Sequence, residues 1–138
     1  MSKMDIWILT LIPIYIFYIT FLGLIMFARR FKAVKNHKIK LSYFRSYQEE
    51  SPQDLKVVQN HFSNQFEVPV LFMITCLAIA ILHQGKPLLF ILGVIFILLR
   101  MGHSFIHLGS NNVKHRALVY FTGIFVLLVM WVALLISY

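Results

Sequence analysis

The sequence predicts an all-α membrane protein whose four transmembrane helices form one bundle, a single domain over residues 1–138. Composition is the first reason, because 59% of the residues are hydrophobic and only 13% are charged, whereas soluble domains average roughly 45–50% apolar and about 25% charged residues. The second reason is the presence of four apolar runs, each near the ~20 residues that a helix needs to cross a bilayer. These features exclude an ordinary soluble enzyme and a disordered tail, and a single cysteine excludes a disulfide scaffold.

The first span is predicted over residues 6–28, a run without any charged side chain. It is too long for the core of a signal peptide, and no small-residue cleavage site follows it. A polar loop over residues 29–59 comes next and carries eight lysines and arginines. Within this loop, Ser51 and Pro52 predict a helix start, with Ser51 as the N-cap and Pro52 in the first helical position.

The second span is predicted over residues 63–82, although its purely apolar part is shorter than a bilayer crossing requires. Asn64 and Glu67 therefore fall within the membrane. The histidine, glutamine, glycine, lysine and proline of residues 83–87 form a predicted tight turn.

The third span is predicted over residues 88–107, which places Arg100 below the membrane interface. Residues 108–115 are rich in turn-forming side chains and make a polar connection. The fourth span follows over residues 117–138.

The distribution of positive charge predicts an integral, multi-pass protein with both termini outside the cytoplasm. Eleven of the 13 lysines and arginines lie on the side of the first and third connections, and the other side has Lys3 and Lys86. Positive side chains concentrate in cytoplasmic loops that face anionic lipid. This topology accounts for the net charge of +8, so we expect a lipid bilayer as the partner and no nucleic acid.

Polar side chains recur at helical spacing in three of the predicted spans. Residues three, four or seven positions apart share one face of a helix. All three sets lie at the predicted cytoplasmic ends of their helices, so they can converge on one pocket that faces the cytoplasm. The sets are Asn64 with Glu67, Arg100 with His103 and His107, and Arg116 with Tyr120.

Two interpretations of these residues remain open. An ionisable side chain within a span costs about 2.5–3.5 kcal/mol on insertion scales, so such residues usually pair or serve a function. Arg100 and Glu67 could form a buried ion pair that only joins two helices, while Arg116 extends toward the lipid headgroups. Alternatively, two arginines against one glutamate leave a positive pocket, which suits a small anionic ligand held by paired hydrogen bonds.

A metal site is the weaker interpretation of the same residues. His103 and His107 are four positions apart, a spacing that can chelate an ion, but no glutamate follows the first histidine as in zinc proteases. Arg100 would also repel a cation. We therefore expect no metal, and we expect that Cys76 serves packing rather than chemistry.

Two segments resemble the MAPEG family, the membrane-associated proteins in eicosanoid and glutathione metabolism. Their amino-acid sequence is most similar to the bacterial-type branch of that family. The segments are NHFSNQFEVPVLF (60–72) and RMGHSFIHLGSNNVKHRALVYFTG (100–123), and ARRFKA after the first span also fits. The resemblance implies a homotrimer with glutathione as cosubstrate, bound between subunits near the cytoplasmic face. It implies glutathione transferase or peroxidase activity on a hydrophobic small-molecule substrate.

The resemblance also implies roles for single residues. Asn64 and Glu67 would hold the peptide backbone and amino group of glutathione, with Arg100 and His103 on the next wall. Arg116 would be the catalytic arginine that stabilises the thiolate, in keeping with the preference of a thiol beside a cation for its ionised form. Tyr120 would be a nearby pocket tyrosine, and His107 stands where several family enzymes have a tyrosine.

Three positions depart from the family pattern. Asn60 and Ser63 stand where eukaryotic members carry arginines for the carboxylates of glutathione, and Ala117 replaces a serine of the prostaglandin-synthase branch. These departures support an alternative, a non-catalytic lipid-binding or scaffold protein of the same family. A small transporter or channel subunit is a third possibility, since four short helices could form a pore as an oligomer.

Overall fold

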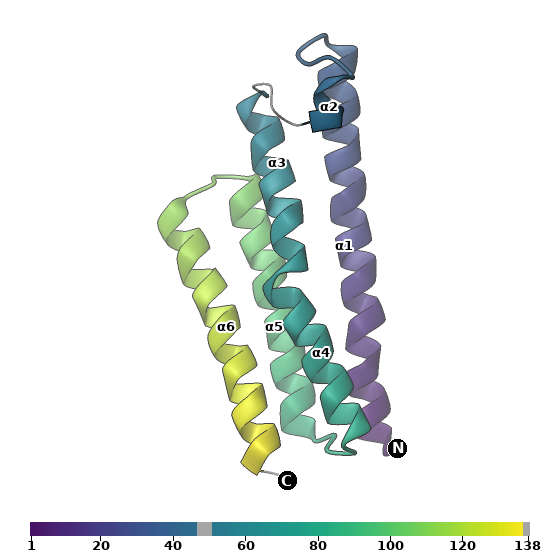
Figure 1. Ribbon diagram of the computed structural model, residues 1–138. Helices are drawn as coiled ribbons and strands as arrows, with labels where there is room; N and C mark the ends of the chain where they lie inside the picture. The colour runs from purple at the N-terminus through teal and green to yellow at the C-terminus, as the bar shows by residue number, and fades with distance from the viewer. Residues whose placement is uncertain (47–50, 137–138) are drawn as a thin grey trace.

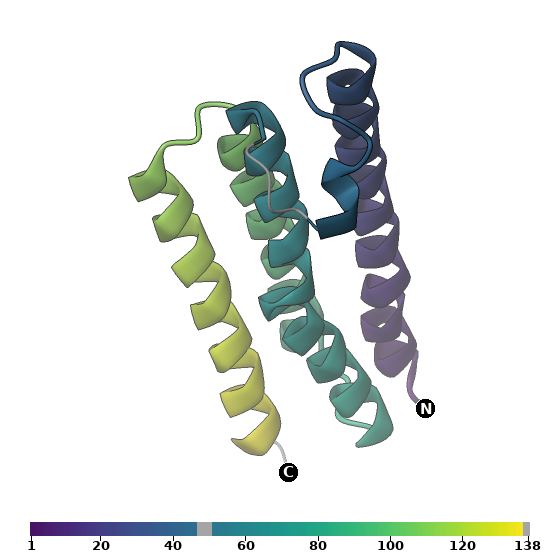
Figure 2. The ribbon, with the colours of Figure 1, turned by 45° about the horizontal axis from the view of Figure 1, so that its top comes forward.

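The protein is a bundle of long helices, seen in a computed structural model that describes residues 1–46 and 51–136 (Figures 1 and 2). No strand occurs in these two ranges, and the predicted all-α fold is confirmed. The helices in chain order are α1 (Lys3–Lys35), α2 (Tyr43–Ser46), α3 (Gln53–Ser63), the 3-10 turn η1 (Asn64–Phe66), α4 (Val68–Ile81), α5 (Pro87–Leu108) and α6 (Val113–Ile136).

Four stretches of helix are long and apolar enough to cross a membrane. They are α1, the rod formed by α3, η1 and α4, then α5 and α6. The predicted spans fall on these stretches, except that Leu82 follows the end of α4 and residues 137–138 lie outside the described part. Large apolar side chains cover the outside of the bundle, as expected of a surface that contacts lipid rather than water.

The first helix extends seven residues beyond the predicted span, into the predicted polar loop over residues 29–59. Lys32 and Lys35 lie in the last turn of α1, where positive charge interacts favourably with the helix dipole. The helix ends only where His37 adopts a left-handed backbone, with a φ of 54°. Charged residues thus ended the apolar run in the sequence without ending the helix.

The predicted cap of α3 is displaced by one residue. Pro52 occupies the N-cap with an extended backbone, and the helix begins at Gln53. Ser51 is therefore one position too early, and its hydroxyl makes no hydrogen bond. Asp54 instead provides negative charge in the first turn.

A break between α3 and α4 decides where the polar side chains of this rod point. Pro69 lies in the first turn of α4, and it has no N–H to donate to the carbonyl group four residues earlier. The chain tightens into η1, and Glu67 adopts a non-helical backbone with φ −102° and ψ −108°. As a result the side chain of Glu67 is exposed, not buried within the bundle.

An aromatic group fills the centre of the bundle. Phe72 of α4 stacks on Phe96 of α5 with 4.4 Å between ring centroids, and Tyr15 of α1 contacts both rings. Gly93 allows the close approach of α1 and α5, because a Cβ atom there would collide with the side chain of Leu11. Below and above this core, the two ends of the bundle contain buried polar groups.

Both termini lie at one end of the bundle, beside the turn that connects α4 and α5 (Figure 1). Asp5 is fully buried there and forms a capping box with Ser2 at the start of α1. Its Oδ1 atom accepts a hydrogen bond of 2.8 Å from the backbone N–H of Gly85. The predicted turn over residues 83–87 is confirmed, and Asp5 attaches it to α1.

Candidate ligand-binding site

A cluster of buried polar side chains lies toward the end of the bundle opposite the termini. Arg100, His103 and His107 come from one face of α5, and their exposed fractions are 1%, 2% and 4%. The rod that begins with α3 adds His61 and Gln65, which are also buried. The predicted shared face of α5 is therefore confirmed by the geometry of a regular helix.

Arg100 is a buried cation without a buried anion. Its Nη2 atom donates to the backbone oxygen of Asn64 at 3.2 Å, and its Cζ atom lies 5.6 Å from the centroid of the Tyr120 ring. Its Nε and Nη1 atoms have no hydrogen-bond partner. The buried ion pair considered for Arg100 and Glu67 does not form, and within residues 1–46 and 51–136 the ion pair found is that of Asp5 with His83.

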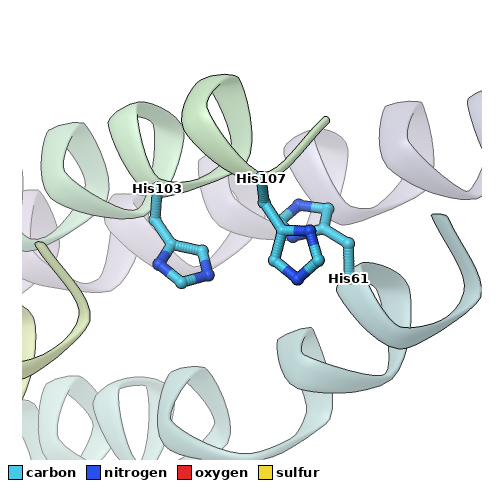
Figure 3. Close-up of side chains that lie close together, drawn as sticks. All are labelled: His61, His103 and His107. Atoms are coloured by element: carbon cyan, nitrogen blue, oxygen red, sulfur yellow. The ribbon is translucent and has the colours of Figure 1, made fainter. Parts of the chain in front are cut away.

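Three histidine rings meet beside this arginine (Figure 3). The ring of His61 stacks on that of His103 at 5.8 Å between centroids and lies 4.9 Å from that of His107. His61 was missed by the sequence analysis, because depth was counted from residue 63 onward. The available signal was the i, i+4 spacing of His61 and Gln65, which places both on one helix face.

Two tyrosines of helix α1 form hydrogen bonds with the cluster and with Ser104 beside it. The hydroxyl of Tyr15 donates to Oε1 of Gln65 at 2.7 Å, and Nε2 of Gln65 lies 3.3 Å from Nε2 of His61. The hydroxyls of Tyr18 and Ser104 are hydrogen-bonded, and that of Ser104 also donates to the backbone oxygen of Arg100 at 3.0 Å. Neither tyrosine was predicted from the sequence as a site residue.

Arg116 joins the cluster from the first turns of α6. Its Nη1 atom donates to Oδ1 of Asn111 at 2.9 Å and lies 3.3 Å from Nε2 of His107. Tyr120, one turn later, has its ring centroid 5.9 Å from that of His103. Five predicted residues are thus brought together on α5 and α6, while Asn64 takes part through its backbone and Glu67 stays apart.

A comparison with protein families identifies the chain. The model of the MAPEG family matches residues 8–136, nearly the whole length. The chain belongs to the MAPEG family. No curated protein and no solved structure matches it. Membership supports a membrane, glutathione-related function in general, and the assignment to the bacterial-type branch stays a prediction.

Two adjoining cavities lie beside the cluster in this MAPEG protein. One of about 200 Å³ has a mixed lining that includes the charged Arg29 and Asp54, and it reaches His107 and Asn111, the two residues that contact Arg116. An apolar one of about 370 Å³ lies between α1 and α5 and reaches Tyr18 and Ser104. The two cavities share Leu108 and Gly109, so molecules held in them would lie next to each other.

The electrostatics of the cluster favour an anion. Arg100 and Arg116 both lie here, and among the described residues no carboxylate lies within ion-pair distance of either. Four further nitrogens of the three histidines lack hydrogen-bond partners. Because buried polar groups in folded proteins are normally hydrogen-bonded, so many unpartnered atoms in one place indicate a ligand-binding site.

Proposed function

We propose that this MAPEG protein is a membrane glutathione transferase, with peroxidase-type activity on suitable substrates, which acts on hydrophobic electrophiles. The observation that carries the proposal is the pair of arginines, one buried and one half-buried, without a carboxylate partner in the described chain. A guanidinium group holds carboxylates and other anions through paired, charge-assisted hydrogen bonds. Glutathione supplies two carboxylates and an ionisable thiol.

Arg116 is the proposed catalytic residue. It lies beside the cavity that His107 and Asn111 line, and its guanidinium group is tethered by Asn111. A cation close to a thiol stabilises the thiolate, which is the nucleophilic form. In conjugation of an aryl halide, the thiolate sulfur attacks the ring carbon, a carbon–sulfur bond forms and the halide leaves.

Four of the remaining predicted residues line the proposed glutathione site. Arg100 and His103 form one wall, with Tyr120 and His107 between them and Arg116. Glu67 points out of this chain, so it can hold the amino group of glutathione only from outside the bundle. This placement supports the proposal that the chain forms a homotrimer with the site between subunits.

The hydrophobic substrate is proposed to enter from the apolar cavity. That cavity is bounded by Phe21, Met101 and Phe105, and its surface toward the bundle is formed by Tyr18 and Ser104. Substrates dissolved in the membrane would reach the cluster without crossing water. Glutathione would arrive through the adjoining cavity at His107 and Asn111, at the end of the bundle that the positive-inside rule assigns to the cytoplasm.

The experiment compares glutathione conjugation of a reactive aryl halide by wild type, Arg116→Ala and Lys114→Ala in detergent. Loss of one anion-stabilising donor typically costs a factor of about 10²–10³, so we expect this loss in kcat/KM for Arg116→Ala. Lys114 is an exposed cation on the same helix, and its removal should leave the rate within about twofold. Equal rates in all three proteins, or no activity in wild type, would contradict the proposal.

A second candidate is a non-catalytic lipid-binding or scaffold protein of the same family. The apolar cavity of about 370 Å³ favours it, together with the absence of arginines at Asn60 and Ser63. Calorimetry separates the two functions. A purified protein that retains lipid and shows no heat of glutathione binding would support the scaffold function. Saturable glutathione binding would support the enzyme.

A further inference from the structure

The three histidines form a group that the proposed glutathione chemistry uses only in part. His103 and His107 line the proposed site, but His61 has no part in it. One ligand nitrogen from each of the three lies within 4.8 Å of the other two. Zinc–nitrogen bonds of about 2.0–2.1 Å in a tetrahedral site place the nitrogens roughly 3.4 Å apart, so small rotations of these side chains would close the site.

Four of the six ring nitrogens in these histidines have no hydrogen-bond partner. Nδ1 of His61, Nδ1 of His107 and both ring nitrogens of His103 are buried without a hydrogen bond. A buried polar atom without a partner costs free energy, and native proteins rarely leave several together. An ion that accepts one lone pair from each ring would remove three of these deficits at once.

Two of the histidines are well positioned for this role. His103 and His107 are four residues apart on one helix face, the spacing used by helical zinc ligands. His61 is oriented by Gln65, which in turn accepts a hydrogen bond from Tyr15. A metal-bound histidine donates its second ring N–H to an acceptor, so ion binding requires the Gln65 amide to turn its oxygen toward His61.

We propose that His61, His103 and His107 bind one transition-metal ion of the Zn²⁺ class, with a fourth position open to an external ligand. Neutral imidazole nitrogens suit zinc, copper, nickel and cobalt, whereas magnesium and calcium require oxygen ligands. Three protein ligands with one open position are typical of catalytic rather than structural zinc. The expectation of no metal rested on two histidines, and the fold adds the third.

The nearby arginines repel a cation, and this repulsion leads to a specific prediction. Nη1 of Arg116 lies 3.3 Å from Nε2 of His107 and 2.9 Å from Oδ1 of Asn111. Ion binding requires Arg116 to give up the first contact and keep the second. Removing Arg116 therefore should strengthen metal binding, while it abolishes the proposed thiolate stabilisation.

The test titrates chelator-treated full-length protein in detergent with Co²⁺, whose visible absorption reports nitrogen coordination, followed by displacement with Zn²⁺. We expect one saturable site in wild type. Because loss of an outer contact alone weakens metal sites about 10–100-fold, loss of the ligand in His61→Ala should weaken binding by more than about 100-fold. His115→Ala removes an exposed histidine near the same end and should change nothing.

Two further variants keep the test decisive. If His61→Ala is not monodisperse on gel filtration, His107→Gln keeps a polar side chain of similar length and should show the same loss. Arg116→Ala should bind Co²⁺ several-fold more tightly than wild type. Absence of saturable Co²⁺ binding in wild type, or equal binding by wild type and the histidine variants, would overturn the metal site without affecting the glutathione proposal.

Discussion

Each end of the bundle contains a buried charged group, but the two groups differ in their hydrogen-bond partners. At the end with the termini, Asp5 accepts hydrogen bonds from the backbone N–H groups of Ser2 at 2.6 Å and Gly85 at 2.8 Å, and His83 lies 3.6 Å away. At the other end, two nitrogens of the buried Arg100 have no partner. All the partners of Asp5 come from this chain, whereas Arg100 lacks partners for two of its nitrogens. We call the end that contains Arg100 the incomplete end.

This difference separates structure from function. A buried ionic group whose partners are all internal contributes to the fold, whereas one without partners costs free energy until something else satisfies it. Ser2, Asp5 and Gly85 attach the first helix to the α4–α5 turn. The arginines and histidines at the other end are retained at a cost, which supports a site that is completed by a ligand.

Among variants that compare the two ends, the largest effect is expected for Arg100→Met, which removes the unpartnered charge and keeps a long apolar side chain. We expect glutathione affinity to fall by about 100-fold, equivalent to about 2.8 kcal/mol. Thermal stability should stay equal to wild type or rise, because replacing an uncompensated buried charge is often neutral or favourable. Calorimetry measures the affinity, and thermal unfolding in detergent measures Tm. A large fall in Tm would show that Arg100 stabilises the fold, contrary to this interpretation.

The opposite variant is Asp5→Ala. It leaves the N–H groups of Ser2 and Gly85 without their acceptors, so Tm should fall clearly below that of wild type. Conjugation per folded molecule should not change, since Asp5 lies at the far end. A loss of activity that exceeds the loss of folded protein would show that the two ends are coupled.

Much of the fold follows from properties that can be read along the chain. Apolar length predicted the four spans, and the regular helix α5 allowed the shared face of Arg100, His103 and His107 to be predicted. The position of Glu67 was not predicted because the i, i+3 rule assumes an unbroken helix, and Pro69 breaks it. His61 lay outside the predicted span, and only the packing of α3 against α5 brings it to His103.

A smaller effect is expected for Glu67→Gln, which tests whether the incomplete end extends beyond one chain. If a neighbouring subunit completes the site, removal of this exposed charge should weaken glutathione binding about 5–10-fold and leave Tm unchanged. Lys56→Gln, which removes an exposed charge from α3 on the same rod, serves as a control. Equal affinities for wild type and Glu67→Gln would remove this residue from the site.

The smallest expected effect is that of Tyr15→Phe, which deletes the hydroxyl that donates to Gln65. A single neutral hydrogen bond contributes about 0.5–1.5 kcal/mol, so stability should fall by that amount. Metal affinity should fall as well, because His61 loses the support of Gln65. Unchanged Co²⁺ affinity would show that this chain of contacts does not position His61.

The proposal that Arg116 stabilises the thiolate of glutathione is tested most directly by the ultraviolet absorbance of bound glutathione, which distinguishes a thiolate from a thiol. The measurement is made at neutral pH on saturated wild type, Arg116→Ala and Lys114→Ala. We expect a thiolate band for wild type and Lys114→Ala and its loss in Arg116→Ala. The same band in all three proteins, or bound glutathione that remains a thiol in wild type, would contradict the account.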